Sequence, residues 1–274
     1  MVSSITIGVV PSAIPGDRTA ALGELCAALS TKLSVPVRGV HPESYGALVN
    51  ELEKDRVQYA WMPPALLVLT SEDIQLRPLL SAVRNNQTEY SSALFVDANS
   101  PATSLGDLRG GTVAWVERTS AAGYLYPRIQ LASRGIDSTR YFSNELFLGS
   151  HAEVVRAVRD GRAHLGATYA AHPEEGEPIK RSGFIDVAPV WPARVLEWTA
   201  AIPNDVIAGH GLLDRAHHRV FATALTSISS TDDGKKLLWN AFNVDKFIET
   251  PRNSLEQLRA QVQRAREHGL LAHL

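Results

Sequence analysis

The hydrophobic positions of the first 62 residues alternate between the spacing of a β-strand and that of an α-helix. Short β-rich runs predict strands at residues 5–10, 35–40 and 57–62. Between these runs, apolar residues recur at helical spacing after Asp17 and again after Ser44, and both residues are candidate N-caps. Strands that alternate with helices favour parallel pairing through right-handed crossovers. The sequence therefore predicts a largely parallel sheet covered by helices.

A second alternating series follows the polar stretch 84–89, which is predicted to cross between two parts of the fold. Its expected strands are residues 92–96, 112–116, 145–148 and 164–167. Helices are expected near Ser120, from Ser150 and after Leu212, and the last of them ends at Gly269. The apolar stripe of that last helix consists of Leu255, Leu258, Val262 and Ala265.

Two α/β series without a flexible linker predict two lobes joined by short crossings. We expect lobe 1 to consist of residues 1–87 and 193–274, and lobe 2 to consist of residues 88–192. Each lobe is predicted to be a mostly parallel sheet flanked by helices, with the ligand cleft between the lobes. The second crossing is expected in the aromatic, extended stretch 190–201.

Charge and hydropathy narrow the class of partner. The 274 residues include 27 Lys and Arg against 29 Asp and Glu, which gives a net charge of −2 at pH 7. Without a basic block, the chain has no electrostatic basis for binding nucleic acid or an anionic membrane. The longest apolar stretch, 62–69, is far shorter than the ~20 residues of a membrane-spanning helix. We therefore expect neither a nucleic-acid partner nor a membrane span.

The single cysteine and the first residues bear on cofactors and compartment. Cys26 alone excludes an intrachain disulfide and a thiolate metal cluster, and its place on an apolar stripe predicts a buried side chain. No cofactor or metal ion is expected. The N-terminus runs almost directly into the first predicted strand, which leaves no room for an export signal. As written, the chain is expected in the cytoplasm; a truncated precursor would instead place it in the periplasm or on a lipid anchor.

The most informative segment combines a strand, a turn of small residues and a helix start, and it ends at Pro127. Thr119 or Ser120 is predicted to cap this helix, while Ala121 and Ala122 leave the first-turn N–H groups open to an anion. The alternative is an ordinary cap beside small packing residues. Pro127 requires the helix to start late or to kink there.

A second helix start is predicted at Ser150, which forms a capping-box pattern with Glu153. His151 then lies in the first helical turn, where its ring is a candidate donor to a ligand. The alternative is an exposed polar residue at a helix start. Both helix starts together predict a site for one negatively charged ligand.

Four segments together resemble the phosphate, phosphite and phosphonate substrate-binding proteins of ABC importers. They are Tyr45-Gly46, residues 61–64, residues 114–127 and residues 147–161, in the family's order and at suitable intervals. The resemblance covers most of the chain to about residue 205. It implies a two-lobed type 2 periplasmic-binding-protein fold that closes on its ligand about a hinge.

The resemblance also implies which residues bind the ligand. The family's hydroxyl-rich turn maps onto Ser120 and the two alanines after it, and its histidine maps onto His151. Its tyrosines map onto Tyr45 and Tyr90, and Trp61 is a further candidate for lining the cleft. The complete candidate set is Tyr45, Trp61, Tyr90, Arg118, Ser120, Ala121, Ala122, His151 and Tyr169.

Two departures from the family's pattern affect the expected ligand. Ala121 and Ala122 stand where hydroxyls are common, and two missing donors at about 1.5–3 kcal/mol each would cost roughly two to four decades of affinity. Arg118 replaces a proline of the family, either as a compensating bidentate donor or as a solvated turn residue. Arg194 and Tyr169 lie near positions where family members that bind aminophosphonates carry acidic residues, so we expect no cationic group on the ligand.

The leading hypothesis is a monomeric, non-enzymatic receptor that encloses a phosphonate, phosphite or phosphate ion by hinge closure and delivers it to an ABC permease. Two alternatives on the same fold remain open. In a cytosolic enzyme, His151 would act as a general acid or base with Glu117 or Tyr169 as its partner. In an intracellular sensor, the C-terminal helices would report ligand binding to another protein.

Overall fold

The computed structural model describes residues 3–9, 19–84, 86–118, 120–171, 173, 177–251 and 253–269. The chain divides into two compact units. Unit 1 consists of Met1–Thr88 and Pro203–Leu255, and unit 2 consists of Glu89–Ile202 and Glu256–Leu274. The predicted cap Asp17 and the alternative cap Thr119 lie outside the described residues.

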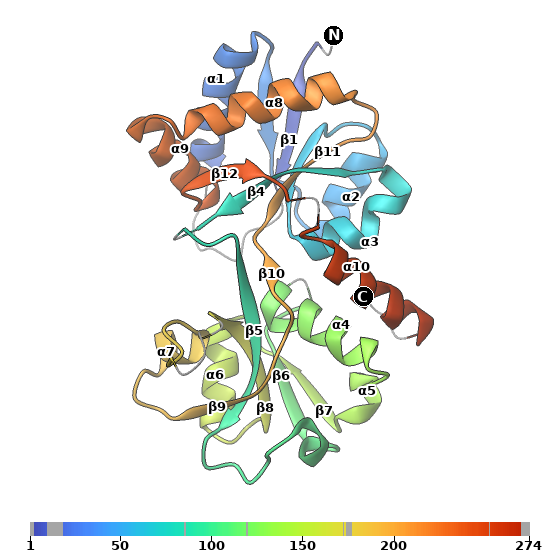
Figure 1. The fold of residues 1–274 in the computed structure, drawn as a ribbon, viewed down its shortest axis with the longest axis vertical. Coiled ribbons are helices and arrows are strands. Elements are labelled where there is room, and N and C mark those ends of the chain that lie inside the picture. Colours follow the sequence, from blue (N-terminus) through green and yellow to red (C-terminus); the bar gives the residue numbers. More distant parts are fainter. Residues whose placement is uncertain are drawn as a thin grey trace. The chain divides into compact units, whose positions relative to one another are not determined.

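Unit 1 contains a six-stranded sheet in the order β12-β4-β11-β3-β1-β2. Its strands are β1 (Ile5–Val9), β2 (Val37–Val40), β3 (Tyr59–Met62), β4 (Arg77–Val83), β11 (Val206–Gly209) and β12 (Lys246–Glu249). Its helices are α1 (Thr19–Leu33), α2 (Tyr45–Glu53), α3 (Pro64–Ile74), α8 (Arg215–Ile228) and α9 (Asp232–Phe242). Helix α1 packs against α8 and α9, while α2 packs against α3 (Figure 1).

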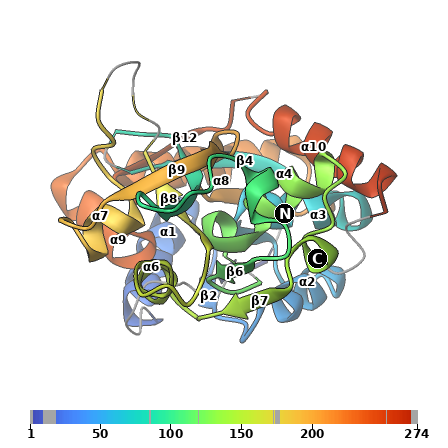
Figure 2. The same ribbon diagram turned by 90° about the horizontal axis from the view of Figure 1, so that it is seen from below.

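Unit 2 contains a second six-stranded sheet, in the order β10-β5-β8-β6-β7 with β9 also paired to β5. Its strands are β5 (Glu89–Asp97), β6 (Thr112–Trp115), β7 (Asn144–Phe147), β8 (Leu165–Ala170), β9 (Ala193–Trp198) and β10 (Ile202–Pro203). Its helices are η1 (Leu105–Leu108), η2 (Ala121–Leu125), α4 (Tyr126–Ser133), α5 (Ser138–Tyr141), α6 (His151–Arg159), α7 (Gly183–Val187) and α10 (Glu256–Glu267). Helices α6 and α7 lie on one side of β8 and β6, and α4 lies on the other (Figures 1 and 2).

The sheets are mixed, which corrects the expectation that each is mostly parallel. Strand β1 pairs in parallel with β2 and β3, but β11 pairs antiparallel with β3 and β4, and β12 pairs antiparallel with β4. In unit 2, β6 is parallel to β7 and β8, whereas β5 is antiparallel to β8 and β9. Parallel pairing requires a crossover connection between the paired strands. The chain reaches β11 without such a connection, because it enters the strand directly from the segment of unit 2 that ends at Ile202, and β11 pairs antiparallel with both neighbours.

The division into units differs from the expected lobes in two segments. Strand β9 pairs with β5, and α10 packs against α4, so both belong with unit 2 rather than with lobe 1. The apolar stripe of α10 is confirmed for Leu258, Val262 and Ala265, which are buried. Leu255, the fourth expected member, is also buried but precedes the helix. Amphipathic periodicity shows which face of a helix is covered but not by which neighbour.

Local signals in the sequence are mostly confirmed. Ser44 accepts a hydrogen bond from the Ala47 N–H at 3.0 Å, as a cap should. Pro127 lies in the first turn of α4, where its missing N–H breaks no helical bond. Cys26 is buried in α1, and burial raises the pKa of its thiol to about 11, so the residue packs as a small apolar side chain. No helix in the described part of the chain is long and apolar enough to cross a bilayer.

Candidate functional site

The first predicted helix start lies just beyond the carboxyl end of β6. Ser120 is the N-cap, and its Oγ accepts a hydrogen bond from the Gly123 N–H at 3.1 Å. The N–H groups of Ala121 and Ala122 have no hydrogen-bond acceptor among the residues that the structure describes. Since the first N–H groups of a helix have no intrahelical partner, these two remain available as donors to an anion.

The first turn of this helix is π-helical and tightly packed. The Leu125 N–H donates to the Ser120 carbonyl oxygen at 2.9 Å, five residues back. A Cβ on Gly123 would overlap Cγ2 of Val116 and would lie 2.7 Å from Oγ of Ser120, so only glycine fits. The small residues that the sequence showed here therefore have a packing role as well as leaving the amides open.

Ser92, which the sequence did not single out, supports this turn from β5. Its Oγ donates a buried 2.6 Å hydrogen bond to the carbonyl oxygen of Ala122. Its N–H donates in turn to Oγ1 of Thr199 at 3.0 Å. The carbonyl oxygen of Ala122 is thereby satisfied, and the orientation of the peptide group is fixed.

The second helix start is held to the first by Val116. Ser150 caps α6 by accepting from the Glu153 N–H at 3.2 Å, which confirms the predicted cap. The Glu153 carboxylate pairs with Arg156 instead of completing the predicted capping box. The Gly149 N–H donates to the Val116 carbonyl oxygen at 2.8 Å, and the Val116 N–H donates to the Gly123 carbonyl oxygen at 3.2 Å. One residue at the end of β6 thus fixes the turn before α6 and the first turn of η2.

His151, the first residue of α6, contacts the end of β8. Its Nδ1 lies 3.0 Å from Oγ1 of Thr168, and its ring packs edge-on against Tyr169 with 4.9 Å between centroids. Burial lowers the pKa of the His151 imidazole to about 4, so the ring is neutral at pH 7. A neutral imidazole still offers one N–H donor.

Where these groups meet β8, at Thr168 and Tyr169, the strand pairs with β5, and its last residue, Ala170, also forms a bridge with Ser182. Strand β6 pairs with β8 through Val113 and Ala114, and it ends before the second half of β8. Helix η2 contacts β8 and β5 in the space beyond. His151 and Tyr169 are in contact, and Ser120 caps η2, which packs against β8. These three sequence-predicted site residues lie in unit 2 at or beyond the carboxyl ends of the parallel strands β6, β7 and β8, where α/β sheets commonly bind ligands.

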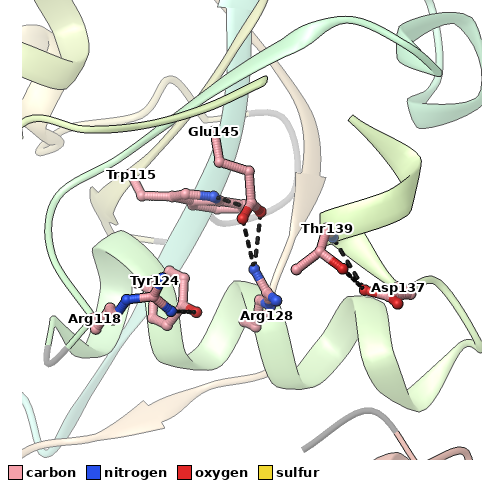
Figure 3. Close-up of polar contacts among 7 residues, drawn as sticks. All are labelled: Trp115, Arg118, Tyr124, Arg128, Asp137, Thr139 and Glu145. Carbon is pink, nitrogen blue, oxygen red and sulfur yellow. Dashed lines mark hydrogen bonds and ion pairs between the residues drawn. The ribbon is translucent and has the colours of Figure 1, made fainter. Parts of the chain in front are cut away.

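Arg118 lies over two aromatic rings beside the Ser120 turn. Its guanidinium carbon is 4.7 Å from the ring centroid of Phe147 and 5.9 Å from that of Tyr124, and its Nη1 donates to the Tyr124 Oη at 3.2 Å (Figure 3). The side chain is exposed but oriented by these contacts. These contacts fit both alternatives given above, a bidentate donor to the ligand and a solvated turn residue. Ligand binding by Arg118 stays a prediction.

A buried ion pair supports the aromatic residues under the site. Oε1 of Glu145 accepts from Trp115 Nε1 at 3.1 Å and from Arg128 Nη1 at 2.8 Å (Figure 3). Arg128 is only 4% exposed, and its guanidinium lies 5.3 Å from the ring centroid of Tyr124. Tyr124 therefore has Arg128 and Arg118 as neighbours, which fixes the η2 helix against β6 and β7.

The other candidate ligand-binding residues lie elsewhere. Tyr45 begins α2 and Trp61 lies in β3, both in unit 1. Trp61 is 4% exposed and stacks on Phe242 with 4.8 Å between ring centroids, so its described contacts belong to the core of unit 1. Tyr90 is half-buried at the start of β5 in unit 2. Ligand contact by these three residues stays a prediction.

Arg194 and Tyr169, the residues that weighed against a cationic ligand, have specific partners. Arg194 Nη2 donates to the carbonyl oxygens of Ser100 and Ala102 at 2.7 and 2.6 Å, which anchors the loop after β5. The Tyr169 hydroxyl donates to Asp186 Oδ2 at 2.7 Å. The carboxylate of Asp186, which the sequence did not indicate, therefore lies beside Tyr169.

Acid–base or metal chemistry finds little support in these groups. His151 has its pKa lowered to about 4, and burial together with the Asp186 contact raises the pKa of Tyr169 to about 12. Neither value is near 7, where a general acid or base works best. Among the described residues, no group of three or more His, Cys, Asp or Glu side chains could hold a metal ion.

Comparisons with known proteins agree with this geometry. The sequence model of a family described as "ABC transporter, phosphonate, periplasmic substrate-binding protein" matches residues 7–254. XAC2383 from Xanthomonas citri, solved with ATP bound, is 22% identical with a TM-score of 0.77 and covers 97% of this chain and 99% of its own. At such identities the likeness to solved structures shows a shared fold.

Two further solved structures are linked to phosphonates, one by its transporter and one by its bound ligand. A binding protein component of an ABC phosphonate transporter from Pseudomonas aeruginosa, PA3383, is 17% identical with a TM-score of 0.69 and covers 99% of this chain and 90% of its own. PhnD1 from Prochlorococcus marinus, in complex with methylphosphonate, is 16% identical with a TM-score of 0.67. The match covers 98% of this chain and 99% of PhnD1. The type 2 periplasmic-binding-protein fold expected from the sequence is confirmed.

Proposed function

The chain belongs to the family of periplasmic substrate-binding proteins of phosphonate ABC transporters, and from this premise we propose that it binds a small phosphorus oxyanion at the helix starts that follow β6 and β7 in unit 2. The family consists of transport receptors, which confirms the expectation of a binding protein and rules out the enzyme alternative. The ligand residues and the closing motion stay predictions.

One observation carries the proposed site: Val116 holds both helix starts through its own N–H and carbonyl groups. The positive ends of η2 and α6 therefore act on the same region, and helix N-termini favour anions. The donors there are the Ala121 and Ala122 N–H groups and the His151 ring. These donors are uncharged, so their contacts to the ligand rely on hydrogen bonds and helix dipoles.

Ser120 contributes a further donor in spite of its capping role. Its Oγ accepts from the Gly123 N–H, so the hydroxyl proton is still available to an oxyanion. This proton and the oriented Arg118 partly compensate for the hydroxyls that Ala121 and Ala122 lack. We therefore expect weaker binding of a bare phosphonate than in family members whose turn carries more hydroxyls.

The ligands of two structural neighbours support a phosphorus oxyanion. PhnD1 from P. marinus was solved with methylphosphonate and XAC2383 from X. citri with ATP, and both ligands carry tetrahedral phosphorus with several terminal oxygens. A site built from helix N-termini fits that group in either molecule. ATP therefore belongs in the ligand panel beside methylphosphonate, phosphite and phosphate.

The partner and the compartment follow from the family. As a substrate-binding component, the protein works with an ABC transporter, and its family acts in the periplasm. We propose that it acts there as a monomer. Light scattering on a sizing column tests the monomer, and fractionation of cells that express the gene from its native locus decides between the periplasm and the cytoplasm expected from the sequence as written.

The direct test is titration calorimetry with this panel on the wild type and on Ser120→Ala and His151→Ala. Each variant removes one hydrogen bond to a charged ligand, so affinity should fall roughly ten- to a hundredfold. Ser104→Ala, which removes the cap of η1 in the same unit, and His217→Ala on an exposed side chain of unit 1 are the controls and should leave affinity unchanged. Unchanged affinity in both site variants would reject the proposed site.

A further inference from the structure

The contact between His151 and Thr168 determines which ring nitrogen of His151 carries the proton. Nδ1 of His151 and Oγ1 of Thr168 are 3.0 Å apart, a normal hydrogen-bond distance. The ring is neutral at pH 7, because burial lowers its pKa to about 4. One ring nitrogen then donates and the other accepts. A hydroxyl can play either part, so the surroundings of Thr168 decide the arrangement.

Thr168 has one acceptor for its hydroxyl proton within the described parts of the chain. The side chain is fully buried in β8, and its hydroxyl bonds only to His151 there. A hydroxyl that accepted from Nδ1 would leave its own proton buried without an acceptor, an arrangement that folded proteins avoid. The Thr168 hydroxyl therefore donates to Nδ1, and the ring proton lies on Nε2.

Gly183, the first residue of α7, keeps the hydroxyl in this position. A Cβ at residue 183 would overlap Oγ1 of Thr168, so a larger residue would displace the hydroxyl. The start of α7 is held to the end of β8 by the Ala170–Ser182 bridge and by the hydrogen bond from the Ala171 N–H to the Arg181 carbonyl oxygen at 2.8 Å. Because Thr168 is also β-branched, its side chain has little rotational freedom.

We propose that Thr168 is a positioning residue that fixes His151 in the Nε2–H tautomer, so that the ring offers a neutral N–H donor to the bound oxyanion. The inference rests on the proposed function for the identity of the acceptor. In the other tautomer, Nε2 would present a lone pair and repel an anion. Nε2 has no hydrogen-bond partner among the described residues, which leaves its proton for the ligand.

The tautomer is measurable without any ligand, by long-range proton–nitrogen NMR of protein with ¹⁵N-labelled histidine at pH 7. In the wild type we expect a protonated Nε2 and an unprotonated Nδ1 for His151, assigned by loss of the signal in His151→Gln. Thr168→Val removes the hydroxyl at nearly constant volume and should give a mixture of tautomers. Thr168→Ser keeps the hydroxyl and should restore the wild-type pattern.

Binding supplies the second measurement. Thr168→Val should weaken methylphosphonate binding roughly three- to tenfold, because part of the ring population loses the donor. Thr168→Ser should bind within about twofold of the wild type, and matching circular dichroism spectra confirm that all variants fold. An Nδ1–H tautomer in the ligand-free wild type would overturn the inference. So would an Nε2–H tautomer that stays unchanged in Thr168→Val. An Nε2–H tautomer in a protein that binds no oxyanion of the panel would overturn the proposed function instead.

Discussion

The N–H of Gly149 donates a 2.8 Å hydrogen bond to the carbonyl oxygen of Val116, across the gap between the end of β6 and the start of α6. Gly149 has a φ of +77°, which side-chain-bearing residues rarely adopt. The glycine is therefore what lets the chain turn from β7 into the Ser150 cap while it stays bonded to β6. The position of His151 depends on this backbone conformation.

Gly149→Ala should lower both stability and affinity. No atom lies within 4 Å of a Cβ built at residue 149, so the penalty is purely one of backbone conformation, about 1–2 kcal/mol of unfolding free energy. Gly161→Ala is the matched control, because Gly161 also has open space and a positive φ of 71° at the other end of α6. Urea denaturation should give similar losses, but only Gly149→Ala should weaken ligand binding in calorimetry. Equal ligand affinities of the two variants would show that the turn at Gly149 does not position the binding site.

Gly123→Ala should disrupt the first turn of η2. The added methyl group would overlap Val116 and crowd Ser120, and overpacking of this kind costs about 1–3 kcal/mol. Gly23→Ala provides a contrast, since Gly23 is exposed in α1 with no atom within 4 Å of its Cβ position. That variant should gain about 0.5–1 kcal/mol. Thermal unfolding of both variants checks the opposite signs, and a Gly123→Ala protein that binds as the wild type does would contradict the tight turn.

Ser92→Ala removes the buried hydrogen bond to the Ala122 carbonyl oxygen. The unsatisfied carbonyl should cost about 1–3 kcal/mol, and the first turn of η2 should lose its orientation and some affinity. Ser81→Ala is the control in unit 1, where a similarly buried serine donates to Thr250 Oγ1 at 3.1 Å. Both variants should be less stable in urea, whereas calorimetry should show weaker binding for Ser92→Ala alone.

Glu145→Gln tests the ion pair below the site. It keeps an acceptor for Trp115 Nε1 but leaves the buried Arg128 guanidinium without a carboxylate, at a cost of about 3–5 kcal/mol. Glu51→Gln breaks an exposed pair with Arg56 and should cost less than about 1 kcal/mol. Comparison of the two denaturation midpoints measures the effect of burial, and similar midpoints would mean that the Arg128 charge is solvated.

The sequence predicted those features of the site that depend on neighbouring residues. The caps at Ser44 and Ser150 bond to N–H groups three residues ahead, so their signal is contained in a few consecutive positions. The same holds for Pro127 in the first turn of α4. The resemblance to a known family adds the prediction that Ser120 and His151 share one ligand site.

Features that depend on pairing between distant segments could not be predicted. Ser92 bonds to a residue 30 positions away, and Thr168 bonds to one 17 positions away, so each contact exists only once β5, β8 and the two helix starts are assembled. The antiparallel pairing of β11 and the packing of α10 against α4 depend in the same way on tertiary structure. Alternation of apolar and polar residues gives the face of an element but not the identity of its neighbour.

The neutral state of His151 should make stability depend on pH between about 7 and 5. The folded ring has its pKa lowered to about 4, whereas the ring of the unfolded chain titrates near 6.5. As pH falls through 6.5, the unfolded state binds a proton that the folded state does not, so stability falls. For a half-buried ring that solvent partly screens, the loss by pH 5 should be about 1 kcal/mol.

His151→Gln isolates this effect. The variant has no titrating group at residue 151, so its unfolding free energy should fall less than that of the wild type between pH 7 and pH 5. Burial also lowers the pKa of His218, but that residue is present in both proteins and its contribution cancels in the difference. Above pH 5 the aspartates with lowered pKa values remain ionised in both folded and unfolded states. Parallel pH profiles for the two proteins would mean that the His151 ring is charged in the fold at pH 6, which would also remove the neutral N–H donor from the site.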